Sequence, residues 1–196
     1  MLSPPPPFER MQSTWESLSA RYEAYQLALP GSPQFICQPQ VCNAHCCRAF
    51  SVNLGDGEVE RMQRSSGLQP IQFLESENGE LITLPLAQPF LLKRAGNHCA
   101  QLRDDLGCGQ YEGRPNACHL YPHFVIFVDP GTARPVHLEL PAMQEAVASA
   151  ISGEGDSHIA LLLRHTECPG FTGPAMSLGE WRTLFTQTFA LQFPPA

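Results

Sequence analysis

Lysine is almost absent from this chain. Lys93 is the only one, and lysine and arginine together number 12 against 19 aspartates and glutamates. With a formal net charge of -7, the chain lacks the material for a broad basic face, so nucleic acid is not an expected partner. Long apolar runs are lacking too, because the longest cover residues 124–128 and 159–163. Both are far shorter than the roughly 20 residues that span a bilayer, so no membrane association is expected.

Signals of secretion are also missing. The first residues, MLSPPPPFERMQ, contain neither a basic segment nor an apolar segment of a signal peptide, and no Asn-x-Ser/Thr sequon occurs. We therefore expect a cytoplasmic protein, in which disulfides rarely persist. The 196 residues, of which 43% are hydrophobic and 16% charged, suffice for one domain with a buried core and extensions.

Cysteine is abundant by contrast, with eight residues in three segments. Their spacing is C-x4-C-x3-C-C in the first segment, C-x8-C-x9-C in the second, and C-P-G in the third. The eight cysteines are Cys37, Cys42, Cys46, Cys47, Cys99, Cys108, Cys118 and Cys168. Thiolates on short loops can converge on one point, and they select zinc or iron–sulfur clusters over hard cations.

Three interpretations of these cysteines stay open from the spacing alone: ligands of a metal or cluster, a disulfide framework, or buried inert thiols. No Cys-x-x-Cys occurs, which disfavours zinc ribbons and thioredoxin-type redox pairs. The bacterial ferredoxin run and the HExxH motif of zinc hydrolases are missing as well. The adjacent pair Cys46-Cys47 fits one tetrahedral metal poorly, because neighbouring side chains tend to diverge.

The segment around the second cysteine group has an unusual charge. Residues 93–123 hold four basic and three acidic side chains, a balance of +1 in a chain of -7. Positive charge there would offset thiolate charge and lower the pKa values of the cysteines. Arg114 is the expected contributor beside the metal, and His45 and His119, next to cysteines, are reserve ligands.

Apolar spacing predicts helices at both ends of the chain. Seven residues spaced alternately by three and four predict one amphipathic helix up to Pro30: Phe8, Met11, Trp15, Leu18, Tyr22, Tyr25 and Leu29. Its stripe would pack on the domain's own core or serve as a homodimer or partner surface. Ser177-x-x-Glu180 is a capping box that opens the last helix.

Between these ends we expect an α+β fold with an irregular, cysteine-rich centre and a small β-hairpin. The hairpin would pair residues 71–74 and 81–84 across a Glu77-Asn78-Gly79 turn. Residues 124–128 read as a buried strand. The expected helices cover residues 57–66, capped by Asp56, 143–151 and 159–164. The expected domains are an arm and helix at 1–34, a metal-binding domain at 35–170, and a final helix at 171–196 packed on that domain.

The cysteine segments resemble the YkgJ-like cysteine-cluster family, also called the CxxCxxCC or zinc- or iron-chelating family. The resemblance begins at Phe35-Ile-Cys37, continues through Cys46-Cys47-Arg48, resumes over Cys99–Cys108, and ends near Cys168-Pro-Gly170. Its most distinctive piece is Tyr111-Glu-Gly-Arg-Pro-Asn-Ala-Cys-His-Leu-Tyr-Pro122. The family's usual first motif is C-x2-C-x2-CC, whereas the longer spacing here is similar to that of the flagellin lysine N-methylase branch.

The resemblance implies that all eight cysteines are metal ligands and that Arg114 acts from outside the ligand set. The first hypothesis is a [4Fe-4S] protein with a redox or cluster-dependent protein-modifying role, for which a protein or peptide would be the partner. The methylase resemblance adds methyl transfer, although no GxGxxG loop for S-adenosylmethionine is present. The alternative is a non-enzymatic zinc module whose helices present an interaction surface.

Overall fold

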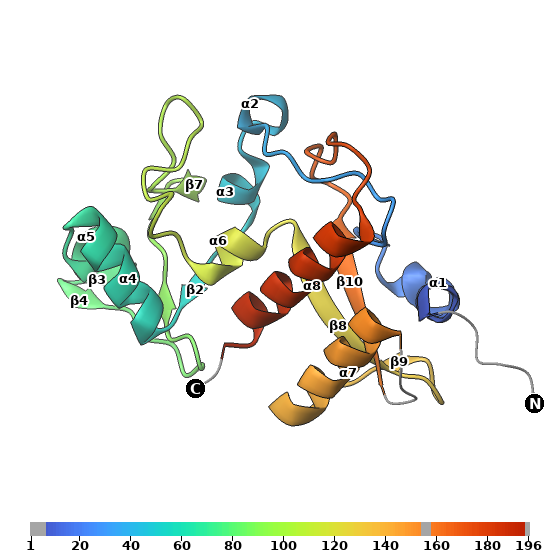
Figure 1. Cartoon of the computed structure of the whole chain (residues 1–196). Helices are drawn as coiled ribbons and strands as arrows, with labels where there is room; N and C mark the ends of the chain where they lie inside the picture. Colours follow the sequence, from blue (N-terminus) through green and yellow to red (C-terminus); the bar gives the residue numbers. More distant parts are fainter. Residues whose placement is uncertain (1–6, 154–157, 195–196) are drawn as a thin grey trace, which may run out of the picture. The chain divides into compact units, whose positions relative to one another are not determined.

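The computed structural model describes residues 7–153 and 158–194 and shows a mixed α+β protein, as expected (Figure 1). Its chain forms two compact units, one of residues 1–36 with 122–196 and one of residues 37–121. Residues 1–6 of the expected N-terminal arm lie outside the described residues. Within those residues, no helix has the length and apolar character needed to cross a membrane.

A four-stranded antiparallel sheet organises the first unit, in the order β1-β10-β8-β9. Its strands are β1 (Tyr25–Leu27), β8 (His123–Asp129), β9 (Arg134–Pro135) and β10 (Ile159–His165). The register sets Leu161 opposite Ile126 and Arg164 opposite His123. The strand expected at 124–128 is therefore confirmed as the middle of β8.

The helix expected over residues 159–164 is wrong, because this segment is the strand β10. Six of its seven residues are buried, since β1 and β8 flank it and side chains cover both of its faces. A strand buried on both faces reads as a continuous apolar run, and such a run has no period that separates it from a short buried helix.

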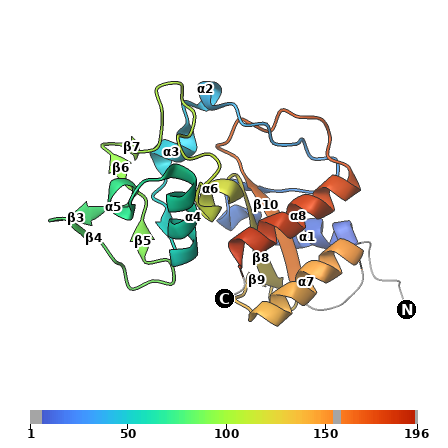
Figure 2. The same ribbon diagram turned by 60° about the vertical axis from the view of Figure 1, so that its left-hand side comes forward.

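The helices of the first unit pack around this sheet. They are α1 (Pro7–Leu18), the 3-10 turn η1 (Ser19–Arg21), α7 (Leu140–Ser152) and α8 (Leu178–Gln192). Figures 1 and 2 show α7 and α8 side by side over one face of the sheet. The expected capping box is confirmed, because the Ser177 hydroxyl accepts a hydrogen bond from the Glu180 amide at 3.3 Å. Fully buried Trp181 anchors α8 by donating from Nε1 to the Ala28 carbonyl at 2.8 Å.

The N-terminal helix is shorter than its apolar spacing predicts. It ends at Leu18, and Tyr25 starts the edge strand β1, which pairs with β10. The available hydrogen-bonding edge of β10 outweighs local helical periodicity there. Met11 and Leu18, from the helical part of the stripe, are buried in the unit's own core.

The second unit consists of short elements with little regular structure between them. Its helices are α2 (Pro39–Cys42), α3 (His45–Ala49), α4 (Asp56–Ser66), α5 (Pro70–Phe73) and α6 (Asn116–Leu120). Its strands form three two-stranded pairs, β2 (Asn53–Leu54) with β5 (Phe90–Leu91), β3 (Ser76–Glu77) with β4 (Glu80–Leu81), and β6 (Arg94–Ala95) with β7 (His98–Cys99). A small core lies where β2, α4 and α5 meet, and its buried residues are Leu54, Val59, Met62, Phe73, Leu74 and Leu92.

Two local expectations in this unit need adjustment. The hairpin turn at Asn78-Gly79 is confirmed by φ values of 53° and 86°, but its strands are only β3 and β4. The segment expected as the first strand begins the helix α5 instead, because Pro70 stands at a helix start and Gln69 and Gln72 form a capping box. The helix expected from residue 57 begins at Asp56, and Gly55 rather than Asp56 is its N-cap.

Candidate metal centre

The first cysteine segment lies on two short helices separated by a left-handed link. Cys42 ends α2, Asn43 and Ala44 adopt φ values of 52° and 50°, and Cys46 and Cys47 lie in the first turn of α3. The reversal gives the two helices different directions, so Cys42 and Cys46 are not on one helical face. The Cys42 thiol is directed to its own helix, where Sγ donates to the Pro39 carbonyl at 3.8 Å.

Arg94 connects this segment to the second one. Its guanidinium donates to the carbonyl oxygens of Arg48 and Phe50 at the end of α3, both at 2.8 Å, and to the Asn97 carbonyl at 2.7 Å. Arg94 also pairs with Cys99 across the β6-β7 ladder. One cation therefore holds the end of the Cys46-Cys47 helix beside the strand that carries Cys99.

The loop between Cys99 and Cys108 folds back on itself. Leu102 pairs with Cys108, and the Gly109 amide donates to the Gln101 carbonyl at 2.7 Å. Asp105 closes the tip by accepting hydrogen bonds from the Gly107 amide and the Arg103 guanidinium. The eight-residue spacing thus forms a hairpin-like loop with both cysteines at its base.

Cys118 comes from α6, which follows the most distinctive sequence motif. The Arg114 guanidinium lies over the Tyr111 ring at 4.1 Å, and its Nε donates to His119 Nδ1 at 3.1 Å. A Cβ at Gly113 would lie 2.8 Å from the Ser65 Cβ, so glycine permits this segment to approach α4 closely. The Arg114 charge acts to lower the pKa of Cys118, but burial and the neighbouring cysteines outweigh it. The pKa of Cys118 is raised, so the expected lowering of the cysteine pKa values is wrong for this thiol.

The adjacent pair Cys46-Cys47 shares a proton. The Cys47 thiol donates a hydrogen bond to Cys46, which lowers the pKa of Cys46 to about 6. The pKa of Cys47 is raised, first by holding that hydrogen bond and then by burial and the neighbouring thiolates. At neutral pH the two neighbours are therefore unlike, with one thiolate and one thiol.

Repulsion between thiolates shows which other cysteines lie together. Burial first, and then the charges of Cys99, Cys108 and Cys46, raise the pKa of Cys118 to about 12. Burial also raises the pKa of Cys99, and Cys108 and Cys46 act on it in the same direction. The structure thus gathers five thiols within electrostatic reach, and we call this group the thiol cluster: Cys46, Cys47, Cys99, Cys108 and Cys118.

The other three cysteines have different surroundings. Cys37 is exposed and begins the second unit, whereas Cys168 is buried in the first unit. The described structure carries reduced thiols at Cys42 and throughout the thiol cluster, which is not a disulfide framework. In the described residues, no group of three or more His, Cys, Asp or Glu side chains is already arranged to hold a metal ion. The chemistry of the donor set nevertheless fits a soft metal, because neighbouring sulfur donors select zinc or iron–sulfur clusters and lose their protons when the metal binds.

His119 is poorly suited to the reserve ligand role. Its Nδ1 lone pair accepts the hydrogen bond from Arg114, so the proton of the neutral ring resides on Nε2. Burial and then the charges of Arg114 and Arg61 lower the pKa of this ring, which keeps it neutral. In this tautomer Nε2 carries the proton and Nδ1 accepts from Arg114, so neither ring nitrogen has a lone pair left for a metal.

Residues 36–147 match the family CxxCxxCC, "Putative zinc- or iron-chelating domain", which covers more than half of the chain. The chain therefore belongs to this family of cysteine-rich metal chelators. No curated protein and no solved structure matches it.

Three residues that support the thiol cluster were not recognised as such from the sequence. Arg94 was noted there only as a positive charge, while Glu58 and Arg61 were not noted at all. Glu58 and Arg61 lie on α4 and hold the start of α6. Their spacing is that of any charged helix surface, and the burial of Glu58, which is 7% exposed, is the feature that marks it.

Proposed function

We propose that the protein binds an iron–sulfur cluster, most simply [4Fe-4S], through four members of the thiol cluster. The ligands would be Cys46, Cys99, Cys108 and Cys118. The observation that supports this proposal is that these thiols lie within electrostatic reach of one another. The charges of Cys46 and Cys108 raise the pKa values of Cys99 and Cys118, although Cys46 belongs to the first cysteine segment and the other three to the second. In this proposal the protein is cytoplasmic. Its cluster would serve electron transfer, redox sensing or the modification of a protein or peptide.

In this proposal Cys47 is a hydrogen-bond donor to the Cys46 sulfur rather than a fifth ligand. A donor to a ligand sulfur tunes the potential of a cluster, and Arg94 and Arg114 supply compensating positive charge. Cys37, Cys42 and Cys168 remain candidate metal ligands, as the full eight-cysteine set implies. The methyl-transfer role suggested by the methylase branch belongs to this same proposal.

The alternative proposal is a zinc module with one or two four-thiolate sites. It is supported by the family description, which covers both metals, and by the modest core of the second unit, which a structural metal would stabilise. Here the protein would have no enzymatic activity, and its helices would present a surface to a partner, including a second copy through α1.

Anaerobic purification of the full chain separates the two proposals. Broad absorption near about 400 nm together with stoichiometric iron and sulfide would support the cluster. Colourless protein with stoichiometric zinc and no iron would replace it with the zinc module. Protein that binds neither metal, made in the presence of both, would contradict both proposals.

Substitution of Cys118 tests the ligand assignment. Cys118→Ser should lower both metal content and stability, because loss of a thiolate ligand and loss of folding are coupled. Metal analysis and thermal unfolding of the purified variant measure the two effects. Cys37→Ser, at an exposed position, is the matched control and should retain the metal of the primary site. An unchanged metal content in Cys118→Ser would remove Cys118 from the ligand set.

A further inference from the structure

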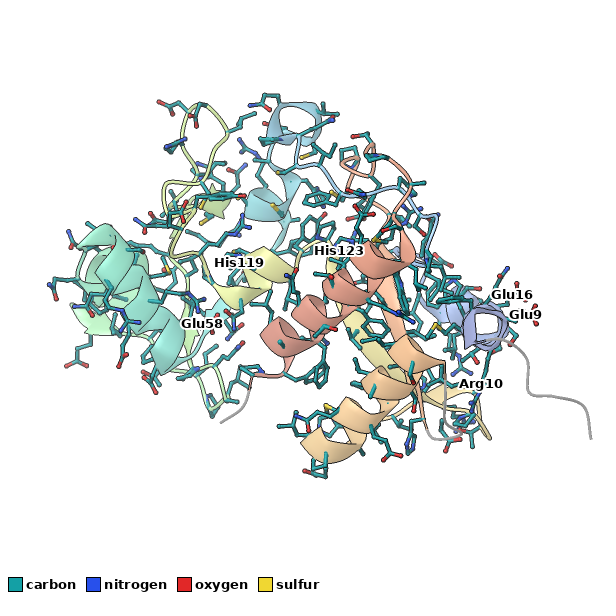
Figure 3. The ribbon with its side chains drawn as sticks, viewed as in Figure 1. Glu9, Arg10, Glu16, Glu58, His119 and His123 are labelled. Carbon is teal, nitrogen blue, oxygen red and sulfur yellow. The ribbon has the colours of Figure 1, made fainter. Side chains whose placement is uncertain are left out.

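Glu58 is a buried carboxylate that uses both of its oxygens on backbone amides. Its Oε2 accepts from the Gly55 amide at 3.0 Å, at the start of its own helix, and from Gln88 Nε2 at 3.4 Å. Its Oε1 accepts from the Asn116 amide at 2.7 Å. One side chain thus caps the N-termini of two helices, α4 and α6, and Figure 3 shows Glu58 between them.

The helix α6 depends on this contact because it has no cap of its own. Its N-cap residue, Pro115, forms no capping hydrogen bond through its side chain. Arg61 supports the same turn by donating from Nη2 to the Arg114 carbonyl at 3.0 Å and to Asn116 Oδ1 at 2.8 Å. Residues 114–116 are therefore held to α4 by three hydrogen bonds, two to the backbone and one to the Asn116 side chain.

Cys118 is fixed by the same turn. Its amide donates to the Pro115 carbonyl at 3.0 Å, so the position of the thiol follows from that of residues 115 and 116. We infer that Glu58 is a positioning residue for Cys118, which it holds at the thiol cluster by capping α6. This inference rests on the proposed metal site for its functional meaning, while the placement of Cys118 can be measured without metal.

Glutamine cannot replace Glu58 in this role. A carboxylate has two acceptor oxygens, whereas an amide side chain has one acceptor oxygen and one NH2 donor. In glutamine the NH2 group would therefore face a backbone N–H at one of the two caps, and two donors form no hydrogen bond. Glu58→Gln must therefore lose one of the two caps, although its size is unchanged. It should keep the local capping-box bond to Gly55, where glutamine also serves, and lose the distant bond to the Asn116 amide on α6. Glu60→Gln, on the exposed side of the same helix, removes an equal charge and is the matched control.

The test uses the full chain and two readouts. The first is the alkylation rate of each thiol in the metal-free protein, measured by mass spectrometry. In Glu58→Gln, Cys118 should react about tenfold faster while Cys42 and Cys168 keep their rates, since a hydrogen bond to a charged group is lost at one turn only. The second is the rate at which Zn²⁺ alone, loaded on the protein, is lost to a chelator, which should rise by a similar factor. Glu60→Gln should change neither.

Asn116→Pro removes the same hydrogen bond from the other side. Proline is accepted at the first position of a helix, and Pro115, with a ψ of 156°, already has the extended conformation that a following proline requires. Asn116→Ala corrects for the loss of the side-chain contact to Arg61. In the Glu58→Gln background, Asn116→Pro should add no acceleration beyond that of Asn116→Ala.

The outcomes are distinguishable. Equal acceleration of all thiols in Glu58→Gln would show general destabilisation and overturn the positioning role, as would fully additive effects of the two substitutions. Two results together would separate the proposals. If Cys118 alone reacts faster in Glu58→Gln, and the wild-type chain binds no metal, the positioning role is supported and the proposed metal site is contradicted.

Discussion

Gly113 is the residue at which the distinctive motif meets α4. A side chain there would overlap the Ser65 hydroxyl and come within 3.3 Å of the Met62 Cα, so the backbone would have to move away. Gly113→Ala should lower the free energy of unfolding by about 1–3 kcal/mol, the usual cost of overpacking. Denaturant unfolding of the wild type and the variant measures this difference in the free energy of unfolding.

The matched control for Gly113→Ala is Gly57→Ala. Gly57 lies within α4, has no heavy atom within 4 Å of an added Cβ, and has no unusual φ. Alanine there should leave stability unchanged or raise it slightly, because it favours the helix. If both substitutions had the same small effect, close packing at Gly113 would be refuted.

His123 should make the first unit sensitive to acid. It is buried beside the rings of Phe35 and Phe171, and burial, with a further contribution from the charge of Arg164, lowers its pKa from 6.5 to about 4. Between these values the unfolded chain binds a proton that the folded chain does not. The free energy of unfolding should therefore fall as the pH falls from about 6.5 to about 4, by roughly 3 kcal/mol in all.

His123→Phe tests this, because it keeps an aromatic ring and removes the titrating group. Its stability should vary less than that of the wild type between pH 6.5 and pH 4, as followed by urea unfolding at several pH values. Substitution of the exposed His137 by Gln is the control and should leave the slope unchanged. A wild-type slope in His123→Phe would assign the acid sensitivity to other groups.

At the scale of elements, α8 is held by its cap and by Trp181. Ser177→Ala removes the hydroxyl that accepts from the Glu180 amide, and should cost about 1 kcal/mol of stability. Thr183→Ala, on the exposed face of the same helix, removes a hydroxyl that bonds only within the helix and should cost little. Thermal unfolding of the two variants measures the difference, and equal losses would argue against the cap.

Elements with local signals could be predicted from the sequence, and elements decided by distant partners could not. The N-terminal cap of α8 and the Asn78-Gly79 turn follow from neighbouring residues, and both are confirmed. The sequence predicts helix at Tyr25 and over residues 159–164, although both form strands. Tyr25 pairs with a strand more than 100 residues away along the chain, and residues 159–164 pair with one over 30 residues away, so neighbouring residues do not reveal either partner.

The candidate site likewise combines features that neighbouring residues reveal with features that depend on distant contacts. Spacing and chemistry single out the eight cysteines and Arg114 as candidates, because thiols and a nearby cation are recognisable residue by residue. Which thiols gather depends on the left-handed link at Asn43-Ala44, the folded loop before Cys108, and the contact of Glu58 with α6. The last of these joins residues 58 positions apart, which a single sequence does not reveal.

At the scale of the whole molecule, the two units differ in how much apolar core they contain. The first unit buries a cluster of 18 residues, while the second buries six and has strand pairs of two residues each. A unit with so small a core needs another source of stability, which a bound metal supplies. Metal removal should therefore destabilise residues 37–121 far more than the sheet that contains β8 and β10.

Tryptophan fluorescence can test whether metal removal destabilises one unit more than the other. Both tryptophans, Trp15 and Trp181, belong to the first unit, so tryptophan fluorescence reports its unfolding alone. Metal content or thiolate-to-metal absorption reports the second unit. After chelation, the thiols of the second unit should become reactive at temperatures where the tryptophan signal is still native. If the tryptophan transition instead falls together with thiol protection, the two units unfold as one, and the metal stabilises the whole chain rather than the cysteine-rich unit.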